Sequence, residues 1–410
     1  MKPEIRRGWR GRALLFLFSQ CVTLFGSTLV QMAVVWYVAL RTSSGTWVAA
    51  FTIAAWLPQF FMSFLGGAWA DRYSRKALII GADAVIALVT LALALAMPRM
   101  EAGPALLPAV LAASALRSLG AGLQAPAVNA VIPTLVPEAH RMRYNGFNAA
   151  MQSLVQFAAP AAAGALLAVS TLRATLLADI LTAALGIGLL ALLKLPRPAP
   201  AERDARLFKA MARGLGYAFR EPALRAVLLV YGLFVLLCVP AGFLAQLFVS
   251  RRFGESYWYL TAVELAGFLG MSGGGLLMSL WGGFRRRSAT LCLGLAAFGA
   301  LAAGMGLARP FPLYLALMLL YGVALTMVQT TATTLLQERA EPAMQGRVFG
   351  LMGAMYSGFL PLGMALFGPL ADVWPLEWLM LGSGLALLAM ALLCFRSRAM
   401  RRGEAGAEEK

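Results

Sequence analysis

The chain has 410 residues, of which 60% are hydrophobic and only 13% are charged. Soluble domains carry about 25% charged residues because most of their surface meets water, so this composition excludes an ordinary soluble protein. A formal net charge of +17 would suit a nucleic-acid binder if the basic residues shared one face. They lie instead in short segments between apolar runs. We therefore expect a lipid bilayer as partner and no nucleic acid.

Apolar runs long enough to cross a bilayer recur along the whole chain. A membrane-spanning helix needs about 20 such residues, and in lipid a single segment satisfies its backbone groups only as a helix. The first run follows basic residues as in a signal peptide, but its length predicts a retained span. We predict an all-α integral membrane protein with about twelve transmembrane helices, at residues 13–40, 47–70, 77–97, 105–134, 146–170, 173–194, 223–249, 257–282, 288–308, 312–337, 347–370 and 375–395.

The distribution of basic residues predicts the orientation. With both termini placed inside, the inner segments hold 28 Lys and Arg residues and the outer loops hold six. Loops that stay in the cytoplasm carry such an excess of Lys and Arg. We therefore predict a multi-pass protein of the inner (plasma) membrane with both termini cytoplasmic. Trp47 and Trp378, near predicted outer ends, agree with an aromatic belt at the interface.

An internal repeat divides the chain into halves. The segment Thr134-Leu-Val-Pro-Glu138 recurs as Thr334-Leu-Leu-Gln-Glu338, about half a chain later. Repeats of this kind in transporters are related by an axis along the membrane normal, and the substrate site lies between the halves. We predict two pseudo-symmetric six-helix halves at residues 1–194 and 223–395.

The longest loop separates these halves. Within residues 195–222, Leu207, Met211 and Leu215 recur at helical spacing among basic residues. This pattern predicts an amphipathic helix on the cytoplasmic membrane surface. Residues 396–410 are predicted to form a cytoplasmic tail.

The segment between the second and third predicted spans combines Gly67 and Asp71 with the basic residues Arg72, Arg75 and Lys76. Gly67 would let a neighbouring helix approach closely. Asp71 can accept hydrogen bonds from a helix N-terminus or pair with an arginine. Contacts of this kind can form in one state and break in another, so we predict a gating segment. For Lys76 alone, a solvated positive-inside charge is an equal alternative.

Four charged residues lie in the interior of predicted spans, away from the span ends. A charge at mid-bilayer costs about 3 kcal/mol on insertion scales, so Arg117 needs a partner or a wet cavity, and a structural ion pair is the alternative. Glu264 has apolar neighbours and is a candidate for binding and releasing a proton, against a structural role. We assign proton coupling to Glu264, Arg117 and Asp179, although Asp179 equally suits a hydrogen bond that supports the bundle. Asp83 lies near the inner loop and could pair with Arg72 or Arg75.

The remaining polar side chains within the spans are mainly neutral amides beside Met, Phe and Trp residues. Such a lining suits a large, weakly polar ligand better than an ionic metabolite. We predict that the substrate cavity is lined by Gln20, Gln31, Gln59, Gln156 and Gln246.

Metal and enzyme chemistry are not expected. The four cysteines lack ligand-like spacing, and His140 is the single histidine. The sequence contains no recognisable nucleophile–base pair, and its loops are short. We therefore predict no cofactor, no metal and no catalytic residues.

Several segments resemble a known family. The run from Gly67 to Lys76 is similar to the signature inner loop of the major facilitator superfamily, with Ser74 where glycine is usual. Arg117-Ser-Leu-Gly-Ala and Gly346-Arg347-Val-Phe-Gly-Leu look like macrolide-efflux proteins of that superfamily, and the resemblance covers nearly the whole chain.

This resemblance implies a monomeric drug–proton antiporter that exports small hydrophobic compounds by alternating access. Relatives with similar motifs carry siderophores or lipids. A siderophore exporter, a lysophospholipid carrier and an importer on the same fold remain alternatives.

Overall fold

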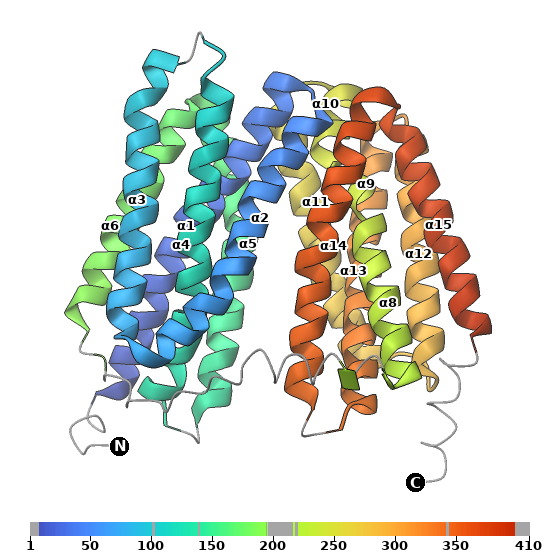
Figure 1. Cartoon of the computed structure of the whole chain (residues 1–410). Helices are drawn as coiled ribbons and strands as arrows, with labels where there is room; N and C mark the ends of the chain where they lie inside the picture. Colours follow the sequence, from blue (N-terminus) through green and yellow to red (C-terminus); the bar gives the residue numbers. More distant parts are fainter. Residues whose placement is uncertain are drawn as a thin grey trace. The chain divides into compact units, whose positions relative to one another are not determined.

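The computed structural model describes residues 8–100, 103–137, 140–193, 195, 216–217, 220–341 and 344–397. Helix is the regular structure throughout these residues, as expected for backbone in lipid. The helices are α1 (Trp9–Thr42), α2 (Gly45–Arg72), α3 (Arg75–Met100), α4 (Leu106–Leu135), α5 (Arg141–Val169), α6 (Leu172–Leu192), α8 (Pro222–Leu237), α9 (Val239–Gly242), α10 (Ala245–Phe253), α11 (Tyr257–Trp281), α12 (Arg287–Leu307), α13 (Phe311–Arg339), α14 (Gln345–Val373) and α15 (Leu376–Arg396) (Figure 1).

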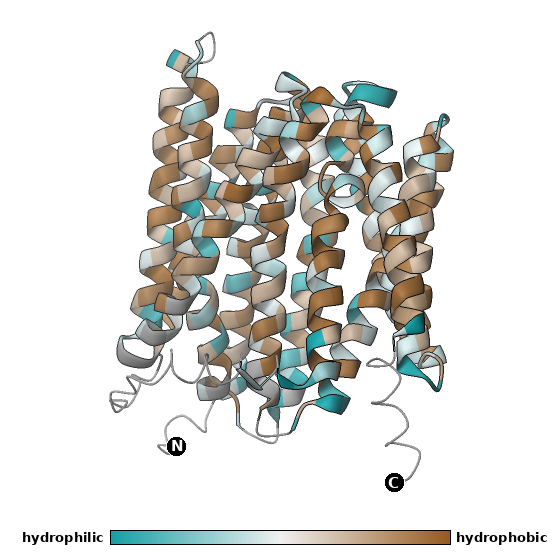
Figure 2. Cartoon of the chain, turned by 45° about the vertical axis from the view of Figure 1, so that its right-hand side comes forward, coloured by the Kyte–Doolittle hydropathy of each residue, from teal (hydrophilic) through white to brown (hydrophobic). Residues whose placement is uncertain are grey.

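The length and apolar character of these helices suit a bilayer. Ten of the described helices are long and apolar enough to cross a membrane. The other two predicted spans correspond to the 28-residue α2 and to the interrupted run α8–α10. Figure 2 shows hydrophobic residues along the helices and hydrophilic ones concentrated toward helix ends and loops. Large side chains on the helix surfaces are exposed, among them Leu88, Leu181 and Leu393, as expected where lipid replaces water.

The chain forms two compact units. Unit 1 consists of Met1–Arg41, Ala50–Arg203 and Ser256–Thr261, and unit 2 of Thr42–Ala49, Asp204–Glu255 and Ala262–Lys410. Most of α1–α6 therefore belongs to unit 1 and most of α8–α15 to unit 2. The first residues of α2 belong to unit 2, whereas the rest of that helix belongs to unit 1.

The predicted amphipathic helix of the linker lies almost entirely outside the described residues, and so does most of the predicted tail.

The seventh predicted span is not one helix. Where the sequence predicts a single span at 223–249, the chain forms α8, α9 and α10. The interruption surrounds Pro240, which lacks a backbone N–H and so cannot donate the hydrogen bond that a regular helix would have there. Beyond it, the Leu244 N–H donates to the Val239 carbonyl at 3.0 Å. This bond joins residues five positions apart, whereas the bonds of an α-helix join residues four apart. The expectation of a continuous span was wrong because it gave this proline no weight.

Glycines allow close helix contacts in unit 2. The helices α12 and α15 approach so closely that a Cβ atom on Gly384 would lie 2.5 Å from the Gly299 carbonyl oxygen. A Cβ atom on Gly299 would in turn lie 2.6 Å from the Gly384 carbonyl oxygen. Small residues permit this approach, and in lipid it is van der Waals packing that holds helices together.

We expect Gly384→Ala to lower the free energy of unfolding by about 1–3 kcal/mol, because the added methyl group overpacks the α12–α15 contact. Gly382→Ala on the same helix is the matched control, since a Cβ atom there meets nothing within 4 Å. It should leave stability unchanged or raise it by up to about 1 kcal/mol through helix propensity. Unfolding of the purified protein in detergent measures both. Equal effects of the two substitutions would contradict the packing argument.

Candidate functional site

A buried ion pair joins three helices of unit 1. Arg117 on α4 pairs with Asp179 on α6 and also donates to the hydroxyl of Thr90 on α3. The side chain of Asp179 is 1% exposed and that of Arg117 is 12% exposed. The Thr90 hydroxyl lies 2.8 Å from the Ile86 carbonyl oxygen and 3.3 Å from Asp179 Oδ2. The arginine therefore has the partner that its position in a span requires.

Next to this pair, a side chain of α4 enters the backbone ladder of α2. The Ser118 hydroxyl accepts from the Gln59 N–H at 2.9 Å and donates to the Ala55 carbonyl at 2.7 Å. In a regular helix, that N–H and that carbonyl would bond to each other. The opening adjoins Pro58, which lies inside α2, and a proline distorts the turn that precedes it. Ser118 thus satisfies backbone groups that the distortion would leave unpaired.

A cavity lies beside these residues within unit 1. It has a volume of about 80 Å³, room for several water molecules. Its polar lining is Gln31, Gln59, Ser114, Arg117 and Ser118 together with Ser27, and the rest is mostly apolar. The guanidinium of Arg117 is therefore both ion-paired and cavity-lining, so the two alternatives considered for it from the sequence coexist.

A second buried polar contact links α3 and α4. The Gln124 amide donates to Asp83 Oδ1 at 2.6 Å, and Asp83 is 4% exposed. Its second carboxylate oxygen, Oδ2, has no hydrogen-bond partner. Each residue lies about two helical turns from a residue of the buried Arg117–Asp179–Thr90 group, Asp83 from Thr90 and Gln124 from Arg117. The ion pair with Arg75 that the sequence left open is not formed, because Arg75 bonds to backbone carbonyls instead.

Unit 2 contains its own buried polar group. The Gln246 amide on α10 donates to Glu264 Oε1 on α11 at 2.6 Å. Gln246 follows directly on the interruption between α9 and α10, and its own Oε1 lacks a partner. The hydroxyl of Tyr314 on α13 is buried and also without a partner, while its ring stacks on Phe248 at a centroid distance of 5.4 Å. Unpaired buried polar atoms of this kind call for a role, such as a ligand, an ion or a proton.

The predicted gating segment is only partly visible. The side chains of Asp71 and Arg72 lie outside those that the structure describes. Arg75 donates to the carbonyls of Ala70 at 3.2 Å and Ala130 at 2.9 Å, within unit 1. The basic side chain of Lys76 donates to two carbonyls at the end of α6, those of Ala191 and Leu193, each at 2.7 Å.

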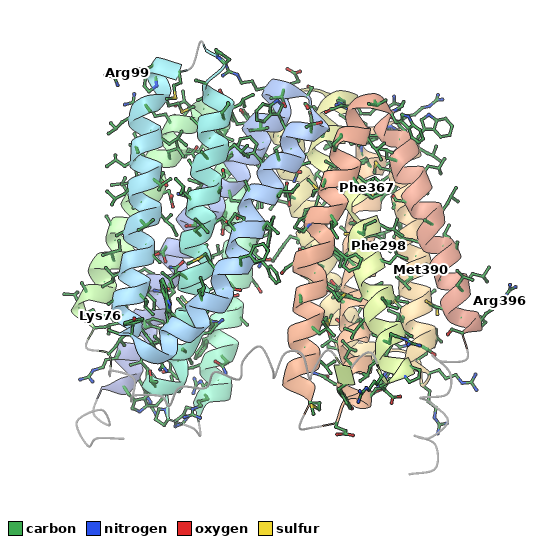
Figure 3. All side chains as sticks on the ribbon, in the orientation of Figure 1. Lys76, Arg99, Phe298, Phe367, Met390 and Arg396 are labelled. Atoms are coloured by element: carbon green, nitrogen blue, oxygen red, sulfur yellow. The ribbon has the colours of Figure 1, made fainter. Side chains whose placement is uncertain are left out.

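Lys76 thus caps the C-terminus of α6, where a cation suits the helix dipole. Lys76 and Arg99 lie at the opposite ends of α3 (Figure 3). The expectation for Gly67 was misplaced in this structure, since a Cβ atom there would meet nothing within 4 Å. Its neighbour Gly66 makes the close contact, against the Gly122 carbonyl on α4.

The five predicted glutamines do not form one set. Gln31 and Gln59 line the cavity of unit 1 with Arg117. Gln246 pairs with Glu264 in unit 2. Gln20 is buried against Ser19, at 3.3 Å from its hydroxyl, and Gln156 is exposed on α5.

The sequence analysis did not single out Thr90, Ser118 or Gln124, which make the buried polar contacts of unit 1 with Arg117, the backbone of α2 and Asp83. One signal was available. Polar residues seven positions apart on neighbouring spans, Asp83 with Thr90 and Arg117 with Gln124, share a helix face.

We expect Asp179→Asn to lower the free energy of unfolding by about 3–5 kcal/mol, because Arg117 would remain buried without a counter-charge. The double variant Arg117→Met with Asp179→Leu should recover most of that loss, since apolar side chains of similar volume replace the pair. Unfolding of the purified variants in detergent measures both effects.

Asp83→Asn is the matched control, because Asp83 is equally buried but contacts an amide rather than an arginine. It should change stability by about 1 kcal/mol or less. A double variant as unstable as Asp179→Asn alone would contradict the ion-pair argument.

Comparisons with known proteins identify the family. The profile described as Major Facilitator Superfamily matches residues 16–364. The chain is 28% identical over 396 residues to macrolide efflux protein A of Streptococcus pyogenes, covering 95% of this chain and 97% of that protein. It is 25% identical over 417 residues to multidrug efflux pump Tap of Mycobacterium tuberculosis, covering 97% and 96%.

A crystal structure of the nucleoside transporter NupG superposes with a TM-score of 0.73 at 14% identity, covering 94% of this chain and 99% of that one. At such identity the likeness concerns the fold alone. The helical architecture and the family profile, which covers most of the chain, agree: this protein is a membrane transporter that belongs to the Major Facilitator Superfamily.

Proposed function

We propose that the protein exports hydrophobic compounds of the macrolide type across the inner membrane, driven by protons that enter in exchange. The observation that carries this proposal is the similarity to macrolide efflux protein A over 95% of the chain. The lining of the cavity in unit 1 matches in character, being mostly apolar with two amides and one arginine, but its volume of about 80 Å³ would hold only part of such a ligand. Such a lining suits a large ligand with few polar groups.

In this proposal Glu264 carries the proton. Its hydrogen-bond partner is the neutral amide of Gln246, so it can gain or lose a proton without breaking an ion pair. Asp179, by contrast, is locked to Arg117, and protonating it would strand a buried cation. We assign Arg117 and Asp179 to a supporting role, in which a change at their pair alters the neighbouring cavity.

The remaining assignments complete the transport cycle. Gln31 and Gln59 contact the ligand in the cavity, whereas Gln20 and Gln156 keep this role only as a prediction. Asp71, Arg72 and Arg75 act in the gate on the cytoplasmic side. Both termini are cytoplasmic in this scheme, and the protein works as a monomer.

The direct test is uptake of a radiolabelled macrolide into everted membrane vesicles with an imposed proton gradient. We expect the native protein to accumulate the compound only when the gradient is present. Glu264→Gln should reduce uptake to that of vesicles without the protein, because the amide cannot carry a proton although it can still accept from Gln246.

Glu255→Gln is the matched control. Glu255 is an exposed acid in the loop before α11, nine residues before Glu264 in the sequence, and its replacement should leave uptake unchanged. Gradient-driven uptake that survives in Glu264→Gln would move the proton to another acid, with Asp83 the first candidate. Uptake only in right-side-out vesicles would indicate an importer, and no uptake in either would exclude macrolides as substrates.

A further inference from the structure

A five-residue pattern occurs at the ends of two helices. The last turn of α2 contains Gly67-Ala-Trp-Ala-Asp71, and the last turn of α14 contains Gly368-Pro-Leu-Ala-Asp372. In both, the pattern is Gly-x-x-Ala-Asp, and the aspartate is the penultimate residue of its helix. The first copy belongs to the predicted gating segment. The second copy was not recognised from the sequence and is described in full by the structure.

The carboxylate of Asp372 binds the start of α2. It accepts from the backbone N–H groups of Gly45 at 2.6 Å and Thr46 at 2.9 Å. It also accepts from the hydroxyls of Ser44 at 2.8 Å and Thr46 at 2.6 Å. The first N–H groups of a helix have no partner within the helix, and its N-terminus carries a partial positive charge. A carboxylate from α14 therefore caps α2, in the place that a side chain of α2 itself would usually fill.

Arg251 holds the same junction from a third helix. This residue, in the last turn of α10, pairs with Asp372 Oδ1 at 3.1 Å and donates to the Ala371 carbonyl at 2.6 Å. It also donates to the carbonyl of Ser43 at 3.1 Å, where the chain turns into α2 with a φ of 47°. One guanidinium therefore bridges the turn before α2 and the end of α14. We call Ser44, Gly45, Thr46, Arg251 and Asp372 the latch.

The glycine of the pattern has a packing role at the same place. A Cβ atom on Gly368 would lie 2.8 Å from the Gly45 carbonyl oxygen, and one on Gly45 would lie 2.8 Å from the Ala371 Cβ. The two helices thus touch backbone to backbone, which brings the Gly45 N–H within reach of the carboxylate. This contact groups residues 42–49 with unit 2, although the rest of α2 belongs to unit 1.

We propose that the latch is a second gate, on the predicted outer side, in which Asp372 and Arg251 are positioning residues that release the start of α2 once in every transport cycle. The inference rests on the proposed transport function. Its chemistry suits repeated release, because the ties are hydrogen bonds and an ion pair at the end of the membrane spans. Water can replace each of these at small net cost.

A disulfide test asks whether the latch must open. In a parent chain whose four cysteines are replaced by alanine, Gly45→Cys and Ala371→Cys place two thiols across the latch and leave Asp372 and Arg251 intact. The matched pair is Gly306→Cys with Met380→Cys, where the Cβ atoms of α12 and α15 would lie 3.1 Å apart within unit 2. Both pairs bring two Cβ atoms close enough for a disulfide, and in the latch pair the Gly368 carbonyl, which a Cβ atom added at Gly45 would overlap, must also move.

We expect oxidation to abolish macrolide uptake by the latch pair and a reductant to restore it. The α12–α15 pair should keep its uptake when oxidised, because those helices move together. Full uptake by the cross-linked latch pair would overturn the proposal.

A labelling test needs no substrate, so it separates failure of the latch from failure of the proposed function. The single-cysteine variant Ala371→Cys is nearly inaccessible in the closed latch, because Ala371 is 1% exposed. Adding Asp372→Asn should raise its reaction rate with a membrane-impermeant maleimide about tenfold, the effect of losing one charged cap. Adding Glu255→Gln should leave the rate unchanged. An unchanged rate in Asp372→Asn would show that the carboxylate does not hold the junction, even if macrolide export itself is observed.

Discussion

The hydrocarbon core of a bilayer offers no water to a backbone N–H or carbonyl group, so each must be paired within its own helix. The chain meets this constraint with long helices almost everywhere, and two prolines among the described residues show how a lost backbone bond is accommodated. At Pro58, the Ser118 hydroxyl fills the gap in the ladder of α2. At Pro240, the chain breaks into α8, α9 and α10. The Arg117 cavity adjoins the first of these places and the Gln246–Glu264 pair follows the second. Irregular backbone and polar chemistry therefore coincide, as in transporters whose broken helices line binding sites.

The buried charged residues are of two kinds, which differ in whether they can gain or lose a proton without breaking an ion pair. Arg117 and Asp179 neutralise each other and tie α3, α4 and α6 together, which makes them costly to disturb. Asp83 and Glu264 each face an amide, so their protonation changes the charge without stranding a cation. Proton coupling therefore suits the second kind, while the first maintains the shape of the cavity. This division explains why one charge-removing substitution is expected to destabilise the protein and another to stop transport.

Charges at helix ends form a third group. Lys76 binds the carbonyls at the C-terminus of α6, and Asp372 binds the N–H groups at the N-terminus of α2. In both cases the charge has the sign that the helix dipole favours and comes from a different helix. Contacts of this type depend on one helix end staying beside another, so they respond to helix movement more than contacts within a helix do.

The sequence by itself determined the family, the helical class and nearly all helix positions, because a span of about 20 apolar residues has only one stable form in lipid. It also identified Arg117, Asp179 and Glu264, since a charge within such a span is conspicuous against its neighbours. Only the tertiary structure decided their partners. Thr90, Ser118 and Gln124 do not stand out in the sequence, and their hydrogen bonds form only because α2, α3 and α4 pack together. The break at Pro240, the contact of Gly66 in place of Gly67 and the cap that Asp372 gives to α2 were likewise decided by packing, because each depends on which helix lies alongside and hydropathy does not carry that information.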